Sequence, residues 1–124
     1  MARRLQLSVI MQVPLAITFR GMSHTDSIET AIMGWLDCLE HIHDRIQSCH
    51  VWVEAPSSHH RNARQFHVRI LLAVPGRSIV VAHGDHTPGH DDVYAALADA
   101  FLAARRQLQD FAQIRRGETK AHAA

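Results

Sequence analysis

The sequence lacks any apolar run long enough to cross a membrane, so we expect no membrane partner. It contains only two cysteines, Cys38 and Cys49, without the CxxC spacing of redox or zinc motifs. In a reducing compartment such a pair favours two free thiols over a disulfide. The apolar segment after Arg3 and Arg4 is short and interrupted by polar residues, which is not typical of a secretory signal. We therefore expect a cytoplasmic protein.

The signatures of common enzyme classes are also missing. No GxSxG element and no glycine-rich phosphate loop occurs. Cys49 falls on the inner face of an expected strand, a position that argues against a catalytic nucleophile. There is no internal repeat, low-complexity tract or linker, and 124 residues suffice for one core. We predict a single domain that is not an enzyme, needs no cofactor and has no small-molecule substrate.

The net charge of +1 conceals an uneven distribution of charge along the chain. Residues 21–55 hold six acids against one arginine, whereas residues 56–86 hold four arginines against one aspartate. Residues 93–124 hold five basic residues against three acids, and only one of the basic residues is a lysine. The local potential therefore exceeds what the total charge suggests. Eleven histidines add a positive charge that depends on pH.

Alternation of apolar and polar residues predicts four short strands. They cover residues 13–19, 49–54, 66–72 and 79–82. The third strand separates an apolar face from a face that carries His67 and Arg69, with Arg61 and Arg64 in the polar loop before it. Such a cationic strand beside a basic loop favours binding of an anionic polymer over bond-making chemistry.

Two longer segments carry apolar residues at helical spacing and predict amphipathic helices. Ser23 or Thr25 can cap the first, whose apolar stripe reaches Ile46 and whose outer face is acidic. Asp91 or Asp92 can begin the second, whose stripe reaches residue 111.

The order β-α-β-β-β-α predicts an α+β fold in which a four-stranded sheet carries both helices on one face. We expect this single domain over residues 11–116. Residues 1–10 would form an N-terminal extension, and residues 117–124 a short polar tail.

Five segments, in this order, carry a resemblance to a known family. They are ITFRGM at 17–22, RI at 45–46, FHVRI at 66–70 with VPG at 74–76, DDVYAA at 91–96 and RRQL at 105–108. Together they resemble the hibernation-promoting factors and ribosome-associated inhibitors. The resemblance runs from about Met11 to Leu108, and it implies the same β-α-β-β-β-α domain.

The resemblance also implies a function and a partner. Such a protein binds the small ribosomal subunit and its ribosomal RNA during stress or stationary phase. It occupies the channel used by messenger RNA and by A-site and P-site transfer RNA, and so inhibits translation. Family members commonly begin at the position of Met11, and the chain ends soon after the last expected helix, as short members do.

Family members hold ribosomal RNA mainly through basic side chains, and eight arginines match or extend those positions. They are Arg20, Arg61, Arg64, Arg69, Arg105, Arg106, Arg115 and Arg116. Relatives often carry basic residues on the first helix, which is acidic here, so we expect contact through the last helix and the strand-loop region. Each arginine also has a structural alternative: Arg69 can pair with Glu54 on the neighbouring strand, and Arg115 and Arg116 can stabilise a helix C-terminus.

Two other functions stay open. His83, His86 and His90 share a loop with carboxylates, but their spacing fits no strong zinc motif, so we predict no metal site. An apolar area on the outer sheet face, with Trp52, Leu71 and Val80, could instead serve a protein-interaction module or weak self-association. Trp52 and Tyr94 can also stack on bases, but we expect Trp52 to cover the sheet and Tyr94 to seat the last helix.

Overall fold

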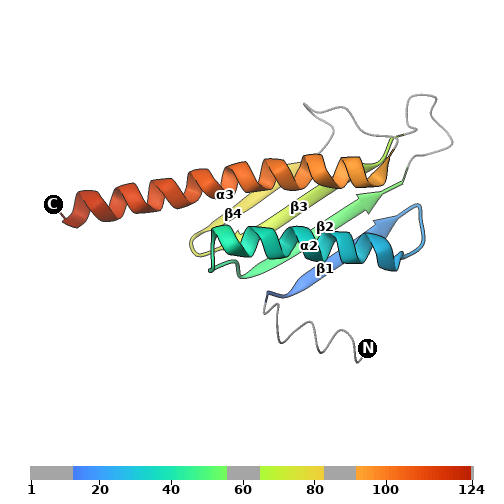
Figure 1. Cartoon of the computed structure of the whole chain (residues 1–124), viewed down its shortest axis with the longest axis horizontal. Helices are drawn as coiled ribbons and strands as arrows, with labels where there is room; N and C mark the ends of the chain where they lie inside the picture. The colour runs from blue at the N-terminus through green and yellow to red at the C-terminus, as the bar shows by residue number, and fades with distance from the viewer. Residues whose placement is uncertain (1–12, 56–64, 83–91, 124) are drawn as a thin grey trace.

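The computed structural model describes residues 13–55, 65–82 and 92–123. Within these ranges it contains four strands and two helices in the predicted order. They are β1 (Leu15–Arg20), α2 (Asp26–Ile42), β2 (Ser48–Glu54), β3 (His67–Val74), β4 (Arg77–Ala82) and α3 (Val93–Ala123). Both helices cover one face of the sheet (Figure 1), which confirms the predicted α+β fold.

The strands lie in the sheet in the order in which they occur in the chain, β1-β2-β3-β4. β1 and β2 are parallel, and α2 makes the crossover that a parallel pair requires. β2, β3 and β4 form an antiparallel meander. Only Pro75 and Gly76 separate β3 from β4, and Gly76 has a φ of 79°, a left-handed conformation that favours glycine.

The two helices begin differently. α2 starts after Thr25, but the Thr25 hydroxyl donates to the Ser23 carbonyl at 3.3 Å instead of capping the helix. α3 follows Asp92, whose carboxylate accepts a hydrogen bond from the Tyr94 N–H at 3.0 Å. Asp92 therefore caps α3 with its side chain, whereas Thr25 occupies the N-cap position of α2 without a capping hydrogen bond from its side chain.

Both helix ends differ from the sequence-based expectation. α2 ends at Ile42, and Ile46, which the apolar stripe had included, is buried in the connection to β2. α3 continues to Ala123, so the segment after Gly117, which the sequence predicts as a polar tail, has a helical backbone up to Ala123. A glycine costs a helix only about 1 kcal/mol relative to alanine, and the helix-forming residues around it outweigh that cost.

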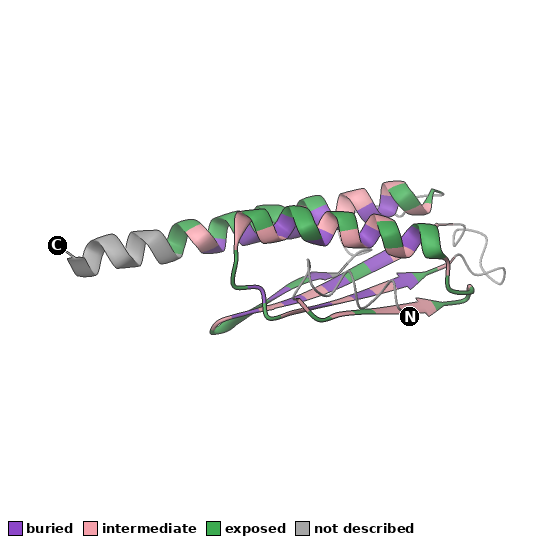
Figure 2. Cartoon of the chain, turned by 60° about the horizontal axis from the view of Figure 1, so that its bottom comes forward, coloured by how far each residue is buried: buried purple, intermediate pink, exposed green. Residues whose placement is uncertain are grey.

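The core lies between the sheet and the two helices (Figure 2). β2, β3 and β4 contribute every second residue to it, and α3 contributes a stripe from Ala96 to Phe111. Trp35 of α2 and Phe101 of α3 stack with ring centroids 5.8 Å apart and planes inclined by 6°, which joins the two helices. Burial of these apolar surfaces from both layers is the main stabilising contribution to the fold.

The opposite face of the sheet carries the side chains that alternate with the core residues. We call it the open face, because no element of the described ranges covers it. Its residues are Ala16, Thr18, Arg20, Ser48, His50, Trp52, Glu54, His67, Arg69, Leu71, Ala73, Ser78 and Val80.

The two free cysteines are expected to differ sharply in reactivity. Cys38 is exposed on α2, whereas Cys49 points from β2 into the core, where burial raises the pKa of its thiol to about 12. Since the thiolate is the reactive form, Ellman's reagent should titrate one thiol per native chain and two in denaturant. The Cys38→Ser variant should show almost no native reaction, and rapid native reaction of that variant would contradict the inward orientation of Cys49.

Candidate functional site

Two of the arginines proposed from the sequence lie on the open face. Arg69 is exposed on β3, between the buried residues Val68 and Ile70. Arg20 is exposed at the end of β1, next to Phe19, which packs against the core. The sheet therefore brings these two cations, far apart in sequence, to one surface.

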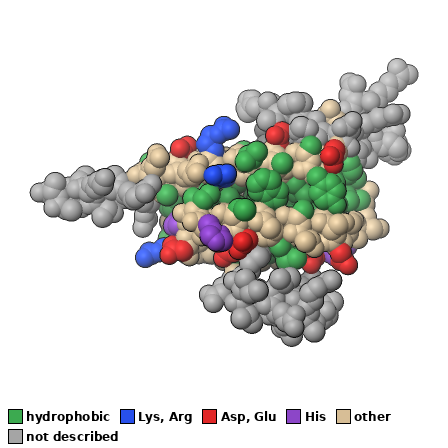
Figure 3. All heavy atoms as spheres, viewed as in Figure 1, with side chains coloured by type: hydrophobic (Ala, Val, Ile, Leu, Met, Phe, Trp, Pro, Cys, Tyr) green, Lys and Arg blue, Asp and Glu red, His purple; other side chains and the backbone are tan. Residues whose placement is uncertain are grey.

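Two others lie on the helical side of the molecule. Arg105 and Arg106 are exposed on α3, and Figure 3 shows basic side chains over this helix. Arg115 and Arg116 belong to α3 as well, but their side chains lie outside the description, and Arg61 and Arg64 lie outside the described residues. The structure thus describes four of the eight arginine side chains: two lie on the open face and two on the opposite, helical side.

Four side chains form a stack in the middle of the open face. The His50 and Trp52 rings lie parallel within 10°, with centroids 3.7 Å apart. The Arg69 guanidinium carbon lies over the Trp52 ring, 4.8 Å from its centroid. On the other side, His50 Nε2 is 2.9 Å from the Thr18 hydroxyl, which fixes the imidazole. We call Thr18, His50, Trp52 and Arg69 the Trp52 stack.

The strand register explains this stack. Thr18, Trp52 and Arg69 are register partners across β1, β2 and β3, and His50 is the next residue of β2 on the same face. Glu54 faces His67 and not Arg69, so the structure gives Arg69 an indole partner where the sequence had suggested a carboxylate. The alternation His50-Val51-Trp52 was the only sequence signal for the stack, and it specifies no cross-strand partner.

The charge of the helical side differs from that of the open face. α2 carries Asp26, Glu29, Asp37 and Glu40 and no lysine or arginine. Burial raises the pKa of Glu40, and the neighbouring Asp37 raises it further while His41 opposes the shift. The four carboxylates and the absence of lysine and arginine on α2 agree with the expectation that RNA contact comes from other elements.

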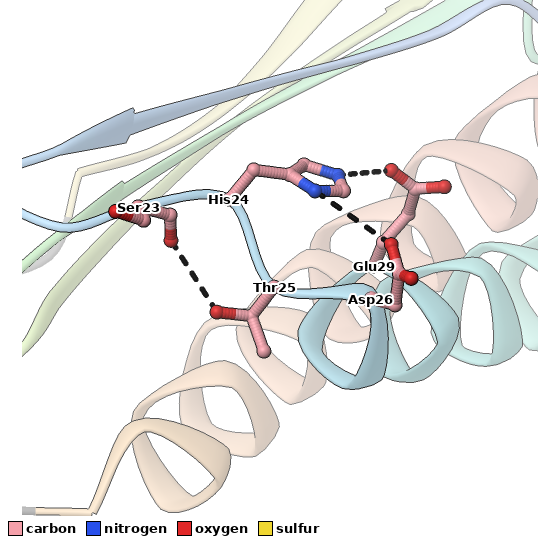
Figure 4. A network of polar contacts seen from close by, with 5 residues as sticks. All are labelled: Ser23, His24, Thr25, Asp26 and Glu29. Carbon is pink, nitrogen blue, oxygen red and sulfur yellow. Dashed lines mark hydrogen bonds and ion pairs between the residues drawn. The ribbon is translucent and has the colours of Figure 1, made fainter.

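Two of these acids bind a histidine at the start of α2 (Figure 4). His24 Nε2 lies 2.6 Å from a Glu29 carboxylate oxygen, and Nδ1 lies 3.7 Å from one of Asp26. The same ring meets Phe19 edge-on, with centroids 5.3 Å apart. The cluster ties the end of β1 to the first turn of α2, a structural role.

Other candidate sites are weaker. A shallow groove between the end of α2 and α3 is lined by Ile42, His43, Arg45, Gln109, Asp110, Ala112 and Gln113. The described residues contain no group of three or more histidine, cysteine or acidic side chains that could hold a metal ion, and the loop with His83, His86 and His90 lies outside them. No helix in the described ranges is both long and apolar enough to span a membrane.

The apolar area that was predicted on the outer sheet face is limited. Val80 is 52% exposed, and its register partner Leu71 is partly buried. Trp52 is half-buried and is engaged by His50 and Arg69. The open face is therefore a mixed aromatic and cationic surface with a small apolar end.

Comparison with known proteins adds a family. The family model described as "Sigma 54 modulation protein / S30EA ribosomal protein" matches residues 15–116. The N-terminal domain of Thermus thermophilus Protein Y is similar in structure, with a TM-score of 0.62 and 22% identity over 80% of this chain and 97% of that one. A ribosomal subunit interface protein from Coxiella burnetii gives a TM-score of 0.67 and 16% identity, covering 82% and 99%. No curated protein matches the sequence.

Proposed function

The chain belongs to the family of sigma 54 modulation proteins and S30EA ribosomal proteins, as the sequence motifs predicted, and we propose that it binds the small ribosomal subunit. The domain, proposed as residues 11–116, occupies the channel of messenger RNA and of A-site and P-site transfer RNA. It acts there during stress or stationary phase and so inhibits translation in the cytoplasm. The mechanism is steric exclusion, with no bond-making step and no cofactor.

The family match over residues 15–116 is the observation that carries this proposal. The placement of the described arginines supports it further, because a protein seated in a channel meets RNA on more than one side. Arg20 and Arg69 provide cations on the open face, and Arg105 and Arg106 provide cations on α3. Arg61, Arg64, Arg115 and Arg116 complete the proposed set of RNA contacts.

Binding to small subunits should fall steeply as salt rises. Each neutralised phosphate lowers the logarithm of affinity by about 0.9 per tenfold increase in salt on duplex DNA, and ribosomal RNA should show the same direction. Co-sedimentation with purified small subunits over a salt series measures the slope, and a purified translation system measures inhibition. Absence of inhibition at saturating protein would remove the proposed function. Salt-resistant self-association without ribosome binding would instead favour the interaction module.

A further inference from the structure

We propose that the open face binds unpaired RNA nucleotides, with the Trp52 stack as the place where a base lies. The inference rests on the proposed function, because it takes ribosomal RNA as the partner. It goes further by specifying that the open face contacts unpaired nucleotides of that RNA. Unpaired bases expose flat surfaces that aromatic rings and guanidinium groups can stack on, whereas bases inside a duplex do not.

The first argument is the chemistry of the Trp52 stack. An imidazole and an indole are already parallel, and the exposed guanidinium of Arg69 lies over the same indole. An RNA base can bind at either end of this stack, against the guanidinium of Arg69 or the imidazole of His50. The hydrogen-bonding distance of 2.9 Å between Thr18 and His50 holds the imidazole in place, so little side-chain freedom is lost on binding.

The second argument is charge complementarity. On the open face two arginines, Arg20 and Arg69, outnumber the one acid, Glu54. On the helical side α2 carries four acids, while the described side chains of α3 balance two arginines against two aspartates. Of the two faces, the sheet therefore has the larger excess of cations over acids and attracts a phosphate backbone more strongly.

The third argument is geometric. The strands present one surface that carries both the Trp52 stack and the cations. Arg69 belongs to the stack, and Arg20 follows Thr18 on the same face of β1, two residues further along. A base on the stack would therefore have its phosphates near cationic groups. Other four-stranded sheets bind unpaired RNA in this way, through aromatic side chains on an uncovered face.

The test uses a fluorescein-labelled oligouridylate, which is unstacked in solution, and the same strand annealed to oligoadenylate. At low salt the full chain should bind the single strand more tightly than the duplex. The Trp52→Leu variant removes the indole on which His50 and Arg69 stack, so it should lose the ordered site for a base. It should bind the single strand roughly five- to hundredfold more weakly, the range that loss of one base–aromatic stack gives. Arg69→Lys keeps the charge but removes the planar group, so it should lose part of the affinity.

Tyr94→Leu is the matched control. Tyr94 is also an exposed aromatic residue, 45% accessible, but it lies on α3 and outside the stack, so this variant should bind the single strand as the wild type does. In a Trp35→Phe background Trp52 is the only tryptophan, and addition of oligouridylate should change its emission. Circular dichroism of each variant shows whether it is folded.

Equal affinity for single strand and duplex, or undiminished binding by folded Trp52→Leu, would overturn the stacking inference. A small-subunit assay on the wild type separates this outcome from failure of the proposed function. If the wild type binds subunits while Trp52→Leu binds oligouridylate normally, only the stacking inference fails. If the wild type does not bind subunits at all, the proposed function fails, whatever the oligonucleotide result.

Discussion

Replacing Arg105 and Arg106 together with glutamate is expected to abolish detectable binding to the small ribosomal subunit and to leave the fold intact. Both side chains are exposed on α3, and neither belongs to the core stripe of that helix. A hydrogen bond to a charged group contributes about 1.5–3 kcal/mol, so loss of two should weaken binding roughly a hundredfold or more. The two new carboxylates add repulsion from the RNA. Co-sedimentation at moderate salt measures the loss.

A charge reversal elsewhere provides the control for this double variant. Arg45 is exposed in the connection between α2 and β2, outside the proposed set of contacts. Arg45→Glu should therefore weaken binding much less than Arg105→Glu alone, which makes the same change of charge on α3. Undiminished binding of the double variant at moderate salt would remove α3 from the proposed contact surface. Equal losses in the two single variants would show that only net charge matters.

The fold could be predicted because its signals are local. Apolar residues at every second position of residues 49–54 and 66–72 indicated two strands and the face of each that is buried. The helical stripes indicated which sides of α2 and α3 face the sheet. The ends of the helices were less predictable. Ile46 continues the period of α2 but lies beyond its end, and Gly117 does not interrupt α3, since tertiary packing and neighbouring residues outweigh single-residue preferences.

The candidate site was only partly predictable, because it depends on pairing between strands. The sequence showed that Arg69 lies on the polar side of β3, but a register difference of two residues decides whether it meets Glu54 or Trp52. The stack on Trp52 also needs Thr18 from a strand 34 positions earlier in the chain. Periodicity within a strand carries no information about such partners.

Truncation of Phe101 to alanine is expected to cause the largest loss of stability from a single substitution in this domain. Phe101 is completely buried on α3, and its ring stacks on Trp35 of α2. Replacing a buried phenylalanine with alanine costs about 3–5 kcal/mol, through lost burial and the cavity that remains. Small domains have a total stability of about 5–15 kcal/mol, so much of the chain could unfold. Denaturant unfolding followed by circular dichroism measures the difference.

Leu102→Ala is the control for this variant, because Leu102 is the next residue of the same helix but is 45% exposed. Both substitutions replace a large apolar side chain with alanine within α3. Helix propensities of leucine and phenylalanine differ by less than about 0.7 kcal/mol, so a larger difference between the two variants reports burial. The Leu102 variant should stay close to the wild type. Comparable losses in the two variants would mean that the interface between α2 and α3 contributes little. The open face is the other side of the same sheet. Under conditions in which the Phe101→Ala variant is unfolded, it should therefore also lose RNA binding.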